Sequence, residues 1–168
     1  GRTIAKRAEA FGMKVVYHNR SRLPEADEAA VGARYASLAE LLRAADHLVI
    51  VVPYSASSHH LIGAAELAQM KPTATLTNIA RGGVVDDAAL AEALRARGIA
   101  AAGLDVFEGE PQVHPALLTV PNIVLTPHIA SASLPTRRAM ADLAATNLIA
   151  ALTGGTPPTA LNPEALRR

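Results

Sequence analysis

The stretch Asn78-Ile79-Ala80-Arg81-Gly82-Gly83-Val84-Val85-Asp86 decides the fold. An apolar, strand-like run from Ala74 to Ile79 leads into Arg81 and a glycine pair, and a helix is predicted to begin at Asp86. Arginine stays charged and presents a planar fork that binds carboxylates bidentately. At the carboxyl end of a buried strand, such a side chain lies where open α/β sheets bind their ligands. The stretch therefore predicts a parallel sheet with a ligand-binding arginine at its edge.

Strands and helices alternate on both sides of this stretch. Strands are predicted at residues 13–17, 47–52, 74–79, 99–104 and 123–125, with Tyr35 as a weaker candidate, and helices at 2–11, 38–44, 64–69, 87–97 and 134–152. Ser37 and Glu40 fit a capping box. Segment 47–52 is almost wholly apolar, which is typical of a strand covered on both faces. The alternation predicts an α/β fold, a doubly wound parallel sheet of Rossmann type.

Composition excludes several classes of function. Apolar residues make up 50% of the 168 residues and the net charge is +1, so nothing attracts the chain as a whole to nucleic acid or to a membrane. Cysteine is absent, which removes disulfides and thiolate metal sites, and no His, Asp or Glu pattern has metal-ligand spacing. No signal peptide or bilayer-spanning run is present. A soluble cytoplasmic protein that holds no metal is expected.

Two further motifs place polar side chains just past strand-like runs. They are Asp105-Val-Phe-Glu-Gly-Glu110-Pro111 and Pro127-His128-Ile129-Ala130. Histidine can donate a proton in one direction of a carbonyl reduction and accept it in the other. A neighbouring carboxylate favours the imidazolium and keeps the histidine a competent acid. Glu108 has the pattern of an ordinary solvated loop charge, and the glycine pair allows the backbone to approach a ligand closely.

With these three motifs in order and spacing, residues 1 to about 163 resemble the nucleotide-binding domain of the D-isomer-specific 2-hydroxyacid dehydrogenases, in their glyoxylate, hydroxypyruvate and 2-ketogluconate reductase group. The resemblance implies that Arg81 binds the substrate carboxylate, that His128 moves the proton, and that Glu110 tunes His128. It implies an oxidoreductase that transfers a hydride from NAD(P)H to a small 2-keto acid, giving a D-2-hydroxyacid. It also implies a homodimer, for which helix 134–152 is a candidate interface, with core packing as the open alternative.

The same resemblance implies the residues that contact the cofactor. They are Gly1, as the third glycine of G-x-G-x-x-G, then Val52, Pro53, Ser58, Ile79, Asp105, His128 and Ala130. Asp105 would face the nicotinamide carboxamide, with a loop cap as the structural alternative.

The loop after the strand at 13–17 bears on the choice of cofactor. Where NAD enzymes carry an acidic residue for the ribose, this chain has Asn19, Arg20 and Ser21, which favour the phosphate of NADP over NAD. A solvated basic turn stays open for Arg22.

In the resemblance, Gly1 stands immediately before a helix as the third glycine of the motif. This implies that the chain lacks the first strand of the dinucleotide fold and the family's separate substrate domain. Residues 1–154 are expected to form the NAD(P)-binding domain, and 155–168 a tail that returns toward the substrate domain. Two other functions stay open: a dinucleotide-sensing interaction module of the corepressor kind, and an inactive truncated remnant.

Overall fold

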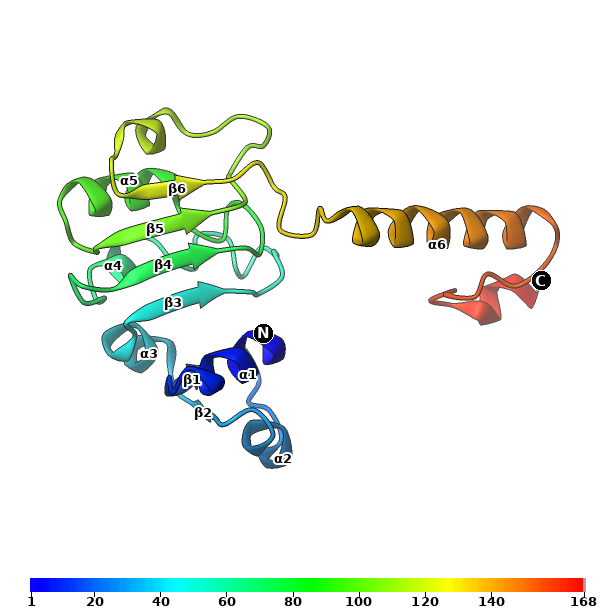
Figure 1. Ribbon diagram of the computed structural model, residues 1–168, viewed down its shortest axis with the longest axis horizontal. Helices are drawn as coiled ribbons and strands as arrows, with labels where there is room; N and C mark the ends of the chain where they lie inside the picture. The colour runs from blue at the N-terminus through cyan, green and yellow to red at the C-terminus, as the bar shows by residue number, and fades with distance from the viewer. Residues whose placement is uncertain (168) are drawn as a thin grey trace. The chain divides into compact units, whose positions relative to one another are not determined.

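The computed structural model describes residues 1–167 and divides into two compact units, Gly1–Pro127 and His128–Arg168. The first unit holds two parallel sheets, with strand orders β1-β2 and β3-β4-β5-β6 (Figure 1). The strands are β1 Val15–Tyr17, β2 Ala33–Tyr35, β3 His47–Ile50, β4 Thr75–Asn78, β5 Ala101–Leu104 and β6 Ile123–Leu125. The parallel strands and flanking helices confirm the predicted α/β architecture.

The helices follow the predicted pattern. They are α1 Arg2–Ala10, α2 Glu25–Ala29, α3 Leu38–Ala44, α4 Ala64–Leu67, α5 Asp87–Arg95 and α6 Leu134–Leu152, with 3-10 turns η1 Pro115–Thr119 and η2 Pro163–Arg167. Helices α3 and α6 have the predicted bounds, and α1, α4 and α5 are one or two residues shorter at their C-terminal ends. The capping box of Ser37 and Glu40 is present at the start of α3. The sequence analysis did not predict α2 or η1, because elements of five residues are too short to show a helical period.

One face of the four-stranded sheet carries the core. Buried and more accessible side chains alternate along β3, β4 and β5, and the buried set packs with residues of α4 and α5 such as Leu67 and Leu90. The prediction that segment 47–52 is covered on both faces was wrong. His47 and Val49 are exposed, because successive side chains point to opposite faces and the described residues put a full apolar layer on one face of β3.

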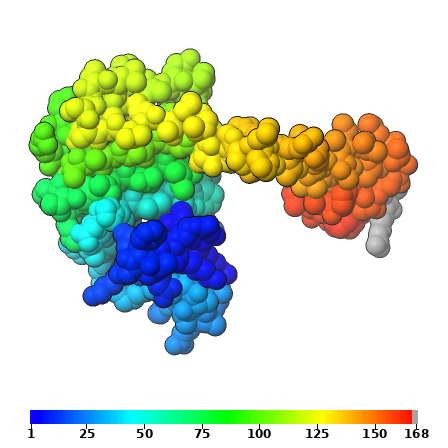
Figure 2. Space-filling view, in the orientation of Figure 1, coloured from blue at the N-terminus to red at the C-terminus, as the bar shows by residue number. Residues whose placement is uncertain are grey.

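The residues around β1 and β2 form a lobe of the first unit, coloured blue in the space-filling view (Figure 2). Its anchor is Glu28 on α2, whose carboxylate accepts Nε and Nη2 of Arg22 at 2.8 Å each and the hydroxyl of Tyr17. The Arg22 guanidinium and the Tyr17 hydroxyl lower the pKa of the Glu28 carboxyl to about 2. This network fixes the far end of the loop that follows β1.

The second unit consists of α6 and the segment that follows it. Ser133 caps α6 by accepting the N–H of Thr136, and Gly154 ends it with a positive φ of 76°. The amide of Asn147 accepts hydrogen bonds from the backbone N–H and the hydroxyl of Thr159, so the tail folds back along the last turns of the helix (Figure 2). The tail is therefore tied to α6 through Asn147 and Thr159.

The described residues include no helix with the combined length and apolarity that a membrane crossing requires. The division of the chain after Pro127 differs in position from the domain boundary expected near residue 154. That boundary stays a prediction.

A backbone contact joins the segments that follow β4 and β5. A Cβ atom placed on Gly82 would lie 1.7 Å from the carbonyl oxygen of Phe107 and 2.7 Å from the nitrogen of Glu108. Only glycine permits this approach. The sequence analysis assigned the glycine pair to a close approach by a ligand, but the partner of Gly82 is the protein's own chain.

Replacing Gly82 with alanine should separate these two segments. The added methyl group meets backbone rather than a flexible side chain, so we expect a loss of about 1–3 kcal/mol of stability, the usual cost of overpacking. Gly103→Ala is the matched control, because its Cβ would find its nearest neighbour 4.0 Å away. Thermal unfolding of both variants checks the prediction, and equal losses would contradict it.

Candidate active site

The carboxyl ends of β3, β4 and β5 surround a cleft of about 860 Å³. Its lining residues are Val51, Val52, Pro53, Tyr54, Ile79, Ala80, Arg81, Gly82, Gly83, Phe107, Glu108, Gly109 and Glu110. The volume falls in the range of roughly 300–1,000 Å³ that is usual for small-molecule and cofactor sites. Its place agrees with the rule that open α/β sheets bind ligands beyond the carboxyl ends of their strands.

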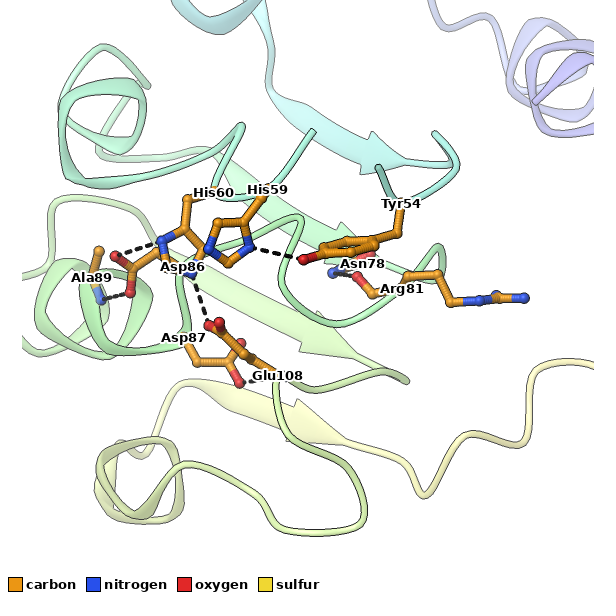
Figure 3. Close-up of polar contacts among 9 residues, drawn as sticks. All are labelled: Tyr54, His59, His60, Asn78, Arg81, Asp86, Asp87, Ala89 and Glu108. Carbon is orange, nitrogen blue, oxygen red and sulfur yellow. Dashed lines mark hydrogen bonds and ion pairs between the residues drawn. The ribbon is translucent and has the colours of Figure 1, made fainter. Parts of the chain in front are cut away.

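Arg81 lies in this cleft, three residues beyond the end of β4. The buried amide of Asn78 fixes the turn, since its oxygen accepts the N–H of Ala80 at 3.0 Å and its nitrogen donates to the carbonyl of Arg81 at 3.1 Å. The Arg81 side chain is exposed, and its Nη1 donates to the carbonyl of Ala80. The guanidinium extends outward from the turn (Figure 3).

Glu110 lines the same cleft from the segment after β5. Its Oε1 accepts the backbone N–H of Phe107 at 2.9 Å, so the segment folds back on its own carboxylate. Gly82 packs against the carbonyl of Phe107 from the other side. The structure thus brings Arg81 and Glu110 to one cleft, as the sequence predicted, on two segments that touch.

His128 and Ala130 belong to the second unit, which begins at His128. His128 has a positive φ of 54°, which is uncommon outside glycine and marks the chain at this point as held in a special conformation. The pairing of His128 with Glu110 stays a prediction.

Four of the cofactor candidates line the cleft or lie beside it. Val52, Pro53 and Ile79 line it directly. Gly1 lies beside them, since a Cβ on Gly1 would come within 3.4 Å of the side chain of Val51. These residues offer apolar surface and a position without a side chain at the start of α1, which fits a ring and a neighbouring phosphate.

Ser58 and Asp105 are held by bonds within the protein. The Ser58 hydroxyl donates to the carbonyl of Pro53 at 2.9 Å and accepts the N–H of Ser55 at 2.7 Å, so it shapes the loop after β3. Asp105 is buried and accepts the hydroxyl of Thr126 at 2.6 Å. This contact supports the structural alternative for Asp105, and contact of either residue with the cofactor stays a prediction.

The two arginines of the loop after β1, Arg20 and Arg22, have different surroundings. Arg22 is engaged by Glu28 and also lies over the ring of Tyr35, 5.9 Å from its centroid. Arg20 and Ser21 are exposed and Asn19 is half-buried. Arg22 is also exposed, but its guanidinium is engaged by Glu28, so its role is structural.

Asp87, the first residue of α5, was not among the residues that the sequence predicted for the site. Asp87 is only 3% exposed, and its carboxylate accepts the backbone N–H of Glu108 at 3.0 Å. Burial raises the pKa of the Asp87 carboxyl above its usual value. Asp87 therefore ties the segment after β5 to the start of α5, and a second acidic residue beside a helix cap was the one signal for it.

Sequence reasoning also missed a cluster on the rim of the cleft. Nε2 of His60 pairs with Oε2 of Glu108 at 2.8 Å, which raises the pKa of the His60 imidazole, and the rings of His59 and His60 stack (Figure 3). Nδ1 of His59 lies 3.2 Å from the hydroxyl of Tyr54. Glu108 is therefore an ion-pair partner and not merely a solvated charge. Spacing along the chain could not show the cluster, because its histidines and its carboxylate come from different loops.

Comparison with known proteins identifies the class as an NAD-binding domain. The family model described as "D-isomer specific 2-hydroxyacid dehydrogenase, NAD binding domain" matches residues 1–130. The chain belongs to this family, which confirms the resemblance.

Among curated relatives, a glyoxylate reductase of Thermococcus onnurineus is 51% identical over 166 residues, which is 99% of this chain and 49% of the relative. A glyoxylate/hydroxypyruvate reductase B of Enterobacter agglomerans is 48% identical, covering 99% of this chain and 52% of the relative. The chain thus spans about half the length of the relatives that it matches.

Solved structures agree with this assignment. An NADPH-dependent glyoxylate/hydroxypyruvate reductase from Sinorhizobium meliloti, in complex with NADP and malonate, has a TM-score of 0.86 at 43% identity, covering 98% of this chain and 50% of that one. A D-isomer specific 2-hydroxyacid dehydrogenase from Lactobacillus delbrueckii, in an NAD-complexed form, has a TM-score of 0.83 at 31% identity, with coverage of 96% and 53%.

Burial of Asp87 has a consequence for stability that depends on pH. A raised pKa in the folded state means that the carboxyl costs stability as the pH rises from its unfolded value near 3.8 through the folded pKa. Asp87→Asn removes the charge and keeps an oxygen that accepts the Glu108 N–H. We expect the free energy of unfolding of the variant, minus that of the wild type, to increase across this window and then level off.

Urea denaturation at a series of pH values measures this difference. Asp46→Asn is the control with the opposite sign, because the hydrogen bond from Lys71 lowers the pKa of the Asp46 carboxyl. The corresponding difference for Asp46→Asn should fall as the pH rises. A difference for Asp87→Asn that does not change with pH would contradict the burial argument.

Proposed function

We propose that the protein is an NAD(P)H-dependent reductase of small 2-keto acids that forms D-2-hydroxyacids. The observation that carries the proposal is the convergence of Arg81 and Glu110 on one cleft, beside the apolar candidates for cofactor contact. The relatives named glyoxylate reductase and glyoxylate/hydroxypyruvate reductase support this substrate class. Glyoxylate and hydroxypyruvate are the first substrates to test.

Each residue has a distinct role in the proposed reaction. Arg81 binds the substrate carboxylate through its planar fork and favours the negative charge that grows on the neighbouring carbonyl oxygen. His128 delivers a proton to that oxygen and takes it back in the reverse direction. Glu110 holds the imidazole in its charged form. The reduced nicotinamide, when bound beside Val52, Pro53 and Ile79, supplies the hydride.

Arg81→Lys tests the site in the full-length protein. Lysine keeps the charge but loses the bidentate fork, so we expect kcat/KM with glyoxylate or hydroxypyruvate to fall by about 10²-fold, while cofactor affinity changes little. Arg97→Lys is the control, because Arg97 follows α5 and lies outside the cleft lining. Steady-state kinetics of the two variants decide the matter, and an unchanged kcat/KM in Arg81→Lys would refute the assignment.

A wild-type protein that binds the dinucleotide but reduces neither keto acid would instead be a binding module. That outcome would favour the corepressor-like alternative or an inactive remnant. In that case kcat/KM of Arg81→Lys and Arg97→Lys could not be compared, because neither variant would turn over. Cofactor binding to the wild type is therefore measured first.

We infer a preference for NADP over NAD from the loop after β1. Asn19 carries no charge that would repel a 2′-phosphate, and the exposed Arg20 and Ser21 can donate to it. The NADPH-dependent relative of known structure supports the same choice. Arg22 is left out of the phosphate site because Glu28 engages it.

The preference is tested by comparing kcat/KM for NADPH and NADH with one keto acid. A charge-assisted hydrogen bond contributes roughly 1.5–3 kcal/mol, so one such contact predicts about a tenfold or greater preference for NADPH. Asn19→Asp combined with Arg20→Ala should reverse it, and Arg34→Ala, an exposed arginine on β2, is the control. A wild-type preference for NADH would overturn the NADP proposal and leave the catalytic roles standing.

We also propose that the protein forms a homodimer and acts in the cytoplasm. Large apolar side chains are exposed along α6, and this supports α6 as the dimer interface. They are Leu134, Met140, Leu143, Leu148, Ile149 and Leu152. Asn147, also on α6, binds the tail through Thr159.

A further inference from the structure

We propose that His59, His60 and Glu108 form a binding site for a divalent transition-metal ion, with zinc as the reference ion, on the rim of the cleft. Each of the three residues offers one ligand atom, and these atoms lie within 4.8 Å of one another. Two imidazoles and a carboxylate are a ligand set that zinc accepts. Figure 3 shows the three side chains turned toward one another, while Arg81 extends away from them.

The backbone holds all three residues in place without a metal. The N–H of His59 donates to the carbonyl of Ser55 at 3.0 Å, and that of His60 donates to the carbonyl of Gly83 at 2.7 Å. The N–H of Glu108 donates to the buried carboxylate of Asp87 at 3.0 Å. A site with fixed ligands loses less conformational entropy on binding, which favours affinity.

The second ring nitrogens of both histidines already have partners. Nδ1 of His59 lies 3.2 Å from the Tyr54 hydroxyl, and Nδ1 of His60 lies 3.7 Å from a carboxylate oxygen of Asp86. Metal-binding histidines usually have such a partner on their other nitrogen, which orients the ring. Nε2 is therefore the natural ligand atom on each ring, and Nε2 of His60 already faces Glu108 at 2.8 Å.

Binding requires one limited rearrangement. The two rings stack with their centroids 3.9 Å apart and their planes at 23°, so the nitrogen lone pairs, which lie in the ring planes, do not converge on one point. Ligand atoms of a tetrahedral zinc lie roughly 3.3 Å apart. The three candidate atoms lie within 4.8 Å of one another, so no pair has to close by more than about 1.5 Å. A turn of the exposed His59 ring out of the stack supplies this movement.

The site would restrain the proposed reaction, and this consequence rests on the proposed function. Glu108 and Glu110 belong to one segment, in which the N–H of Phe107 holds the Glu110 carboxylate at 2.9 Å. A metal ion that draws Glu108 toward His59 shifts the backbone on which Glu110 depends. Zinc should therefore lower kcat.

The experiment measures metal binding directly. Full-length protein freed of metal by a chelator is titrated with zinc chloride against a zinc-binding dye, in the absence of cofactor and substrate. We expect one site per chain that competes with the dye for zinc. In His59→Gln and in Glu108→Gln, the affinity of this site for zinc should fall by at least about tenfold. His60→Asn is a third ligand variant, because asparagine tolerates the positive φ of 50° at this position.

His47→Gln is the matched control. His47 is an exposed histidine that is hydrogen-bonded through Nδ1, at 2.9 Å from the Thr75 hydroxyl, but it has no place in the cluster. Its zinc affinity should equal that of the wild type. Equal affinity of the wild type and His59→Gln would overturn the site, whatever the fate of the other variants.

Turnover with and without zinc separates the metal site from the proposed function. Inhibition of the wild type that is lost in His59→Gln supports the restraint on Glu110, and equal inhibition of both overturns that restraint. A protein that binds zinc in the expected pattern but reduces no keto acid refutes the proposed function and keeps the metal site.

Discussion

The close approach of Gly82 to the carbonyl of Phe107 is the constraint on which the candidate site depends. It lets the segment after β4, which carries Arg81, lie directly against the segment after β5, which carries Glu110. Neither segment has regular secondary structure, so hydrogen bonds must supply the rigidity that a strand or helix would give. Asn78 supplies it on the β4 side and Asp87 on the β5 side. Under the proposed function, a substrate would therefore meet groups that are already positioned.

Local signals were strong enough to predict most of the architecture. The capping box at Ser37 and the approximate bounds of α6 were predicted, because residues close together in the chain carry the signals for a side-chain cap and for a long helix. The strand at 123–125 was also predicted with its bounds. Burial was harder to predict, since the exposed side of β3 depends on what covers the sheet and not on the strand itself.

The residues of the candidate site also divide into those that the sequence could predict and those that it could not. Arg81 and Glu110 were predictable because each stands in a recognisable motif past a strand, and parallel strands bring their ends together. Asp87 and the pair of His60 with Glu108 were not, because both contacts join loops far apart in the chain. Asp87 is buried and Arg81 points outward because of how the segments pack in three dimensions. A short stretch of sequence does not reveal such packing.

The segment after β5 shows how one loop can hold two carboxylates with different partners. Glu110 accepts a hydrogen bond from the backbone of its own segment, whereas Glu108, two residues earlier, pairs with His60 across the rim of the cleft. Between them Gly109 has a positive φ of 80°, which reverses the chain and separates the two side chains. The β3 loop thus reaches the β5 segment through His60, while the β4 segment reaches it through Gly82. A structural change in any one of the three loops should therefore alter the position of Glu110. It would do so through the contacts of His60 and Gly82, which do not involve the substrate.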